Sequence, residues 1–351
     1  SHRLRRGASH PTPRRSERDP SHYSDRLLAG AQIIHGSTVA TNALLEGKTA
    51  RIAFVTNRGF EDLLEIGRQA RPDLYDLNVE RPAPLAPRDL RFGIGGRILH
   101  DGSEVEPLAV EEIGPLGARL RELGVEAVAI CLLHSYADSS HEEAVAATLE
   151  ACGLSVSVSS RLVSEHREYE RASTCAVNAA VAPVVSRYLR RLEEGLRPAG
   201  AGSLRVMGSN GGALSPRAAG DEAVCTVLSG PAAGVRAAAH VGRAVGRTDL
   251  ISFDMGGTST DVCLIPGEVR TTGEAIVAGR PVRIPTIDIH TVGAGGGSIA
   301  WRDAGGALRV GPASAGAEPG PACYGRGGPP TVPAANLVLG RIVPERFLDG
   351  R

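Results

Sequence analysis

Residues 249–266 read DLISFDMGGTSTDVCLIP, and this stretch decides the fold. A short apolar run at 249–253 leads directly into Asp254 and a pair of glycines, and the strand pattern resumes at 261–265. Two strands joined by a glycine turn form a β-hairpin. Adjacent glycines leave backbone N–H groups accessible to a phosphate, and the hydroxyl residues that follow add donors. The stretch therefore predicts nucleotide contacts from Gly256, Gly257, Thr258, Ser259 and Thr260.

Two carboxylates flank this turn, Asp254 before the glycines and Asp261 at the start of the second strand. Carboxylates beside a polyphosphate hold Mg²⁺ through its water shell or orient the attacking group. We therefore predict catalytic roles for Asp254 and Asp261 and a metal contact for Asp254. The alternative is a hairpin turn whose Gly and Asp residues only satisfy backbone geometry. The complete string after an apolar strand favours phosphate binding.

The rest of the chain alternates short apolar runs with helical spacing from Ala31 onward, which indicates an α/β protein. A break or kink is expected at Pro183, inside the longest helix. The proline-rich segment 71–87 is expected to be a surface loop or lid, and a domain boundary is placed near Gly200. Strands are expected at 31–35, 51–56, 125–133, 154–158 and 204–208, and helices at 38–46, 59–66, 110–123, 140–150 and 168–196.

Composition excludes several classes of partner. Lys plus Arg and Asp plus Glu are balanced at 39 each in 351 residues, so no net field draws the protein to nucleic acid or to an anionic membrane. Continuous apolar stretches stay shorter than the ~18 residues of a membrane-spanning helix. The six cysteines are widely spaced without a CxxC pair, and they are interpreted as reduced thiols in a reducing, cytoplasmic compartment.

Two further glycine-containing segments are candidates for nucleotide binding. The run 229–234 precedes a helix of small residues, and the free N–H groups near Gly230 would bind an anion; the alternative is a tightly packed helix start. The run 293–298 follows an apolar strand. Its glycines Gly295, Gly296 and Gly297 would allow a ligand or another backbone segment to approach closely. The alternative is that they form a flexible hinge. We favour nucleotide contact for these three glycines.

Polar side chains suggest a substrate site and a weaker metal site. Thr38, Thr41 and Asn42 lie on one face of a helix and would bind a planar amide ring, unless Thr38 only caps the helix and Asn42 is a buried amide. Asn210 and Gly211, in a glycine turn, are added to this site. Asp288 and His290 are two apart on a strand, so both would face one side and would share a metal. His35 is a further candidate, although a lone histidine near a strand end is more often structural.

Together these motifs resemble a known family. The string 254–261 is similar to the phosphate-binding hairpin of the superfamily that contains actin, sugar kinases and heat-shock ATPases. In order, the segments 36–46, 167–171, 209–212, 229–234 and 288–298 are similar to segments of hydantoinase A and 5-oxoprolinase proteins. The resemblance implies an actin-like ATPase (ribonuclease H-like) fold with two α/β domains around a nucleotide cleft. It assigns 31–200 to an N-terminal-type domain and 201–351 to a partial hydantoinase A/oxoprolinase domain. The residues before them, 1–30, are expected to be a disordered arm because they are rich in Arg, Ser, His and Pro.

The same resemblance implies an activity. It implies ATP and Mg²⁺ as cofactors and hydrolysis of a cyclic amide, 5-oxoproline or a hydantoin, through phosphoryl transfer to the ring carbonyl. A hydantoinase B-type subunit or domain is the implied partner, within an oligomer. The alternatives are the ATP-hydrolysing subunit of an acetone-type ketone carboxylase and a non-catalytic fragment that binds a partner.

The sequence departs from the family pattern in three places. Family members usually carry an earlier glycine turn of the same type before the position of Ala31, and they continue beyond the position of Arg351. At Ala334 the family usually has an aspartate. From these departures we expect this chain by itself to bind ATP weakly or not at all and to hydrolyse no cyclic amide.

Overall fold

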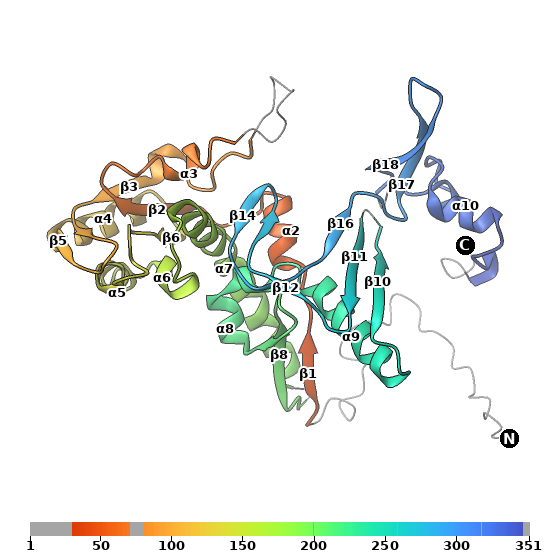
Figure 1. Cartoon of the computed structure of the whole chain (residues 1–351), viewed down its shortest axis with the longest axis horizontal. Helices are drawn as coiled ribbons and strands as arrows, with labels where there is room; N and C mark the ends of the chain where they lie inside the picture. The colour runs from red at the N-terminus through yellow and green to blue at the C-terminus, as the bar shows by residue number, and fades with distance from the viewer. Residues whose placement is uncertain (1–29, 71–80, 199, 258, 317, 347–351) are drawn as a thin grey trace.

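A computed structural model describes residues 30–70, 81–198, 200–257, 259–316 and 318–346. Expectations for the arm before Gly30, for 71–80 and for Thr258 lie outside these residues. The described elements follow one another along an elongated body, with a parallel sheet at one end and a β-hairpin with helix α10 (Val332–Val338) at the other (Figure 1).

The sheet at one end is purely parallel, with strand order β3-β2-β6-β7. Its central strands are β2 (Ile52–Asn57) and β6 (Ala127–Ile130), both fully buried. Side chains alternate between two cores, because successive residues of a strand face opposite sides of a sheet. Ala53 and Val55 pack with helices α4 and α5, whereas Ile52 and Phe54 pack with α7. The remaining bounds are β3 Arg91–Ile94, β7 Ser155–Val158, α4 Val110–Glu122, α5 Ser140–Ala151 and α7 Glu168–Leu196.

The helix α7 has the bounds expected from its spacing, but it runs through Pro183 without interruption. The expected break at Pro183 is therefore wrong, whereas a kink there stays a prediction. An interior proline costs ~3 kcal/mol of helix stability. Residues 170–182 are all buried, since α7 packs against the parallel sheet and against a second core. This packing outweighs the local cost of the proline.

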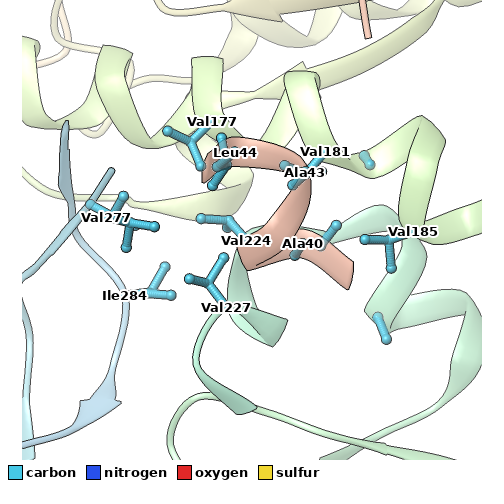
Figure 2. Packing of buried hydrophobic residues seen from close by; sticks show 14 of the residues in the cluster. Ala40, Ala43, Leu44, Val177, Val181, Val185, Val224, Val227, Val277 and Ile284 are labelled. Carbon is cyan, nitrogen blue, oxygen red and sulfur yellow. The ribbon is translucent and has the colours of Figure 1, made fainter. Parts of the chain in front are cut away.

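The second core surrounds the short helix α2 (Val39–Leu45). Figure 2 shows its side chains Ala40, Ala43 and Leu44 lying between Val177 and Val181 of α7 and other buried aliphatic residues. Beside this core, strand β1 (Gln32–His35) pairs in parallel with β8 (Ser203–Met207). The expected boundary near Gly200 thus falls between two strands of one sheet, and the division into 31–200 and 201–351 stays a prediction.

The deciding stretch forms the predicted hairpin. Strand β10 (Asp249–Met255) pairs antiparallel with β11 (Thr260–Pro266), which in turn pairs with β16 (His290–Val292). Helix α9 (Ser229–Ala244) covers one face of this sheet and packs on Cys263 and Ile265. Short apolar runs with a glycine turn were sufficient to predict this hairpin.

The remaining elements are short. The expected strand 125–133 ends early, at Ile130, because the N–H groups of Leu132 and Leu133 bind the side chains of Glu142 and Asn57 instead of a neighbouring strand. The remaining described elements are α3 Leu63–Ile66, η3 Arg88–Leu90, β4 Arg97–Ile98, β5 Glu104–Glu106, α6 Ser159–Leu162, β9 Ala213–Leu214, α8 Pro216–Asp221, η4 Ala223–Thr226, β12 Thr271–Thr272, β13 Ala275–Val277, β14 Arg280–Val282, β15 Thr286–Ile287, β17 Ser298–Arg302, β18 Leu308–Ser314 and η5 Ala322–Tyr324.

Two expectations from composition can be compared with the structure. All six cysteines are free thiols. Burial raises the pKa of Cys131 to about 12, which keeps this thiol protonated and unreactive. Within the described ranges, no helix is both long enough and apolar enough to cross a membrane.

Candidate nucleotide and substrate site

The candidate site forms where β1 and β8 end. These strands are parallel, with His35 opposite Val206, so their carboxyl ends lie at the same edge of the sheet. The turn 36–38 leaves one strand there, and the turn 208–212 leaves the other. Ligands of open α/β sheets bind at this kind of edge. Folding thus brings together two of the segments that the sequence analysis selected.

Helix α9 begins at the same edge and is bonded to the first turn. The Ser229 hydroxyl, which is fully buried, donates to the Ser37 carbonyl oxygen at 2.8 Å and accepts the Ser37 N–H at 3.2 Å. The N–H of Leu228 donates to the Thr41 hydroxyl at 3.2 Å. A Cβ on Gly36 would lie 3.8 Å from the Cα of Gly230. The start of α9 therefore contacts the 36–38 turn, and anion binding at Gly230 stays a prediction.

The Asp254 carboxylate lies beside this helix. Asp254 is near the end of β10 and is exposed, and its Oδ2 would be 4.0 Å from a Cβ on Gly234 in the second turn of α9. Within the described residues the carboxylate has no hydrogen bond or ion pair. An exposed carboxylate without a competing cation suits a hydrated Mg²⁺, which binds through one or two carboxylates and its own waters.

Asp261 stands opposite Asp254 in the register of β10 and β11. Unlike Asp254, it is held in place, because the Thr291 hydroxyl of β16 donates to its Oδ1 at 2.6 Å. The two carboxylates are thus cross-strand neighbours, one fixed by a hydrogen bond and the other available to a ligand. This difference was not apparent from the sequence, because Thr291 is distant along the chain.

The hairpin turn is covered by the glycine run 293–298. Gly296 donates its N–H to the Gly256 carbonyl at 2.8 Å, and Gly297 donates to the Gly257 carbonyl at 2.6 Å. The N–H of Gly295 donates to the Ser298 hydroxyl at 2.8 Å. Approach of a second backbone explains the density of glycine. Nucleotide contact by these three glycines stays a prediction, with their N–H groups already engaged.

The hydroxyl residues of the hairpin differ from one another. Thr260 is buried, and its hydroxyl donates to the Ala294 carbonyl at 2.5 Å. The Thr260 hydroxyl was expected to donate to a phosphate, but its hydrogen is already bonded to a carbonyl of the glycine run. Ser259 is half-buried in the turn, and its carbonyl accepts the Gly256 N–H at 2.8 Å.

The three polar residues of α2 have separate environments. Thr38 and Asn42 are exposed, and the Asn42 amide donates to the Thr38 hydroxyl at 3.3 Å. The Thr41 hydroxyl contacts the start of α9, where it accepts the N–H of Leu228. Thr38 makes no capping bond; Ser37 accepts the N–H of Val39 at 3.2 Å instead. The alternative of a capping Thr38 with a buried amide is therefore wrong, and the Thr38–Asn42 pair is accessible at this edge.

The second turn has a neighbour that the sequence analysis missed. Gly211 has a φ of 75°, as expected for a glycine turn, and the Asn210 side chain accepts the N–H of Gly212 at 2.8 Å. Arg236 of α9 donates to the Asn210 carbonyl at 3.0 Å, and its Nε would be 2.4 Å from a Cβ on Gly211. A guanidinium therefore lies against this turn. No pattern in the sequence marks Arg236, since only folding places α9 beside β8.

The proposed shared metal site lacks support from side-chain geometry. Asp288 and His290 are exposed and 3.9 Å apart between Oδ1 and Nε2. In the described part of the chain, no three His, Cys, Asp or Glu side chains converge to hold a metal ion. His35 is structural: its Nε2 and the Tyr188 hydroxyl are 2.9 Å apart, and burial lowers its pKa. A contact of Asp254 with hydrated Mg²⁺ stays a prediction.

Comparison with known proteins places these features in a family context. The hydantoinase/oxoprolinase family profile matches residues 171–351, and the profile of the hydantoinase/oxoprolinase N-terminal region matches 21–153. The chain is 40% identical to the caprolactamase subunit alpha of Pseudomonas jessenii over 324 residues, covering 90% of this chain and 47% of that protein. It is 38% identical to the 5-oxoprolinase of Saccharomyces cerevisiae over 348 residues, covering 89% of this chain and 26% of that protein.

Two solved structures share the α/β architecture. The ATP-dependent caprolactamase from Pseudomonas jessenii superposes with a TM-score of 0.79 at 37% identity, covering 93% of this chain and 48% of that chain. Nucleotide-free acetone carboxylase superposes with a TM-score of 0.71 at 29% identity, covering 90% and 47%. The chain thus spans about half the length of each of these two structures, and a quarter to a half of the two relatives above.

Proposed function

The chain belongs to the hydantoinase/oxoprolinase family, and on this premise we propose that it handles ATP in a hydrolase of cyclic amides such as 5-oxoproline or a hydantoin. The observation that carries the proposal is the exposed Asp254 carboxylate, beside the second turn of α9 and opposite Asp261. We further propose an actin-like ATPase fold, with the hairpin β10–β11 facing a nucleotide cleft. The antiparallel β10–β11–β16 sheet covered by α9 supports that assignment.

The chemistry requires activation of the amide. Amide resonance opposes attack by water, and transfer of a phosphoryl group from bound ATP to the ring oxygen would produce a better leaving group. Asp254 would hold Mg²⁺ through water, and Asp261 would be kept in position by Thr291. The positive end of the α9 dipole favours negative charge at the same edge. These residues bind and orient the reacting groups, which is the main catalytic task in phosphoryl transfer.

The ring itself is assigned to the exposed pair on α2. An amide ring presents one acceptor and one donor in a plane, and Thr38 with Asn42 offers a hydroxyl and a carboxamide side by side. Asn210 and Gly211, held by Arg236, form the opposite part of the same edge. We propose that the substrate lies between these two groups, near the carboxyl ends of β1 and β8.

Partner and location belong to the proposal as well. A relative described as a subunit alpha supports a separate B-type subunit and an oligomeric enzyme. Six free thiols support a reducing compartment, and we propose the cytoplasm.

A second candidate is the ATP-hydrolysing subunit of a ketone carboxylase, favoured by the likeness to acetone carboxylase. The test is phosphate release by the full gene product with a B-type subunit, supplied separately with 5-oxoproline, hydantoin, or acetone with bicarbonate. Stimulation by a cyclic amide supports the hydrolase, and stimulation only by acetone with bicarbonate supports the carboxylase. Partner binding without phosphate release under any condition would identify the remaining alternative, a non-catalytic partner-binding protein.

A further inference from the structure

A cavity of about 800 Å³ lies at a different place from the candidate site. It is partly open to solvent and is lined by α3 and the residues after it, by residues 81–85, by the first turns of α7 and by the β13–β14 hairpin. The Gly279 turn of this hairpin abuts the chain at Pro82, since a Cβ on Gly279 would lie 2.6 Å from the Pro82 Cγ. The lining residues named below therefore come from elements that are packed together.

Three arginines line this cavity, and they differ in their partners. Arg68 forms a bidentate ion pair with Glu170, at 2.8 and 2.6 Å. Within the described residues, Arg81 donates to the carbonyls of Ile66 and Ala70, and Arg280 donates to those of Ala278 and Ala83. Among the described residues, Arg81 and Arg280 have no carboxylate partner. Two positive charges in the cavity wall thus remain without a described counter-charge.

Tyr169 lies near these charges. Its ring faces Gly67, where an added Cβ would be 3.1 Å from the ring Cζ. Burial raises the pKa of the Tyr169 phenol, while nearby Arg81 and Arg280 act in the opposite direction. The hydroxyl thus stays protonated at neutral pH, and it forms no hydrogen bond within the described residues. It is a donor in the wall of the same cavity as Arg81 and Arg280.

Arg280 is half-buried, and burial lowers its pKa. A guanidinium in such a place loses part of its hydration, and an anion would restore the lost interactions. Carboxylates match the planar guanidinium geometry and also accept from a phenol. Most of the remaining wall is apolar and includes Leu64, Ala176 and Pro281. Among the described residues that line the cavity, the one carboxylate, that of Glu65, is paired with Arg91 at 2.7 Å. A ligand that fits both parts has an acid group and an apolar body.

We propose that this cavity binds a small organic acid, independently of the function proposed above. The carboxylate lies between Arg81 and Arg280, within reach of the Tyr169 hydroxyl. The apolar body lies on Ala176 and Pro281. A ligand lacking either part leaves one half of the cavity without a partner.

The probe is cyclopentanecarboxylate, and its neutral isostere is cyclopentanecarboxamide. Binding of each to the full chain is measured by calorimetric titration in low-salt buffer without ATP. We expect the carboxylate to bind about tenfold tighter or more, because hydrogen bonds to a charged group reach at least that factor. Inorganic phosphate, which lacks the apolar body, is expected to displace the probe only at much higher concentration.

Three variants locate the binding. Arg280→Met keeps the aliphatic stem and is expected to weaken carboxylate binding about tenfold or more. Tyr169→Phe removes only the hydroxyl, so it tests the same cavity if Arg280→Met fails to fold, and a loss of about threefold to tenfold is expected. Arg217→Met, at a side chain 93% exposed on α8, is the matched control and is expected to bind normally.

Two classes of result would overturn the proposal. The first is equal binding of the carboxylate and the carboxamide, or displacement by phosphate as readily as by the probe itself. The second is normal carboxylate affinity in folded Arg280→Met and in Tyr169→Phe.

Discussion

The backbone N–H of Gly297 donates to the carbonyl oxygen of Gly257 at 2.6 Å, so two glycine-rich segments 40 positions apart meet backbone to backbone. A side chain at position 297 would not fit, because a Cβ there would be 2.8 Å from that carbonyl oxygen and 2.9 Å from the Ser314 hydroxyl. The shape of the hairpin turn therefore depends on the glycine run as well as on its own glycines.

We predict that Gly297→Ala lowers the free energy of unfolding by about 1–3 kcal/mol, because the added methyl group pushes two backbones apart and breaks their hydrogen bonds. Denaturant unfolding measures the change. Gly273→Ala is the control, since a Cβ at Gly273 meets no atom within 4 Å and should change stability by less than about 0.5 kcal/mol. Equal stability of the two variants would show that the contact is not tight in solution.

Ser229 fixes the start of α9 against the 36–38 turn. Ser229→Ala leaves the part-buried N–H and carbonyl of Ser37 without their partner, which costs about 1–3 kcal/mol. We expect a lower melting temperature and weaker Mg-ATP binding in the full gene product, because the turn is released from the helix. Ser203→Ala, at an exposed position at the start of β8, should leave both unchanged. A normal melting temperature in Ser229→Ala would refute the assigned role.

The Arg68–Glu170 pair predicts a dependence of stability on pH. Burial, the largest single influence, would raise the pKa of Glu170. The bonds from Arg68, a backbone hydrogen bond and the charges of Arg68 and Arg167 together outweigh burial and hold the pKa below its usual value. Because the pKa of Glu170 is lower in the folded than in the unfolded protein, the ion pair contributes fully to stability above the unfolded pKa, near 4.5. This contribution to stability is lost as the pH falls through the folded pKa.

Arg68→Met should therefore lower the free energy of unfolding at pH 7 by about 1 kcal/mol. This value is small for hydrogen bonds between charged groups, because Arg68 is half exposed to solvent. At a pH below the folded pKa the variant and the wild type should converge. Arg88→Met, which removes an exposed pair with Asp62, should change little at either pH. Denaturant unfolding at both pH values measures this, and a constant difference would contradict the ion-pair explanation.

Much of the fold followed from local pattern. Apolar runs and glycine turns predicted the hairpin and the bounds of α7, because period and turn chemistry are local properties. The continuation of α7 through Pro183 depends on packing from two sides, which a single sequence does not contain. Local propensity gave the wrong result there because tertiary contacts are larger than the cost of one proline.

The site was predictable as a set of segments but not as a set of contacts. The glycines at 293–298 indicated close approach, yet their partner is the backbone of Gly256 and Gly257. Thr260 resembles a phosphate donor in sequence, but its hydroxyl bonds Ala294. Arg236 was missed because an arginine in a small-residue helix has no distinguishing pattern. Each difference arises from pairing between distant segments.

The most direct test of the central claim is Mg-ATP hydrolysis by the full gene product carrying Asp254→Asn, with a B-type subunit present. The change removes the charge, keeps the shape, and alters an exposed group without a described partner, so the melting temperature should hardly move. Asp249→Asn, exposed at the other end of β10, is the matched control and should turn over normally. The account predicts loss of phosphate release by about a hundredfold or more in Asp254→Asn alone. Normal phosphate release in that variant would contradict it.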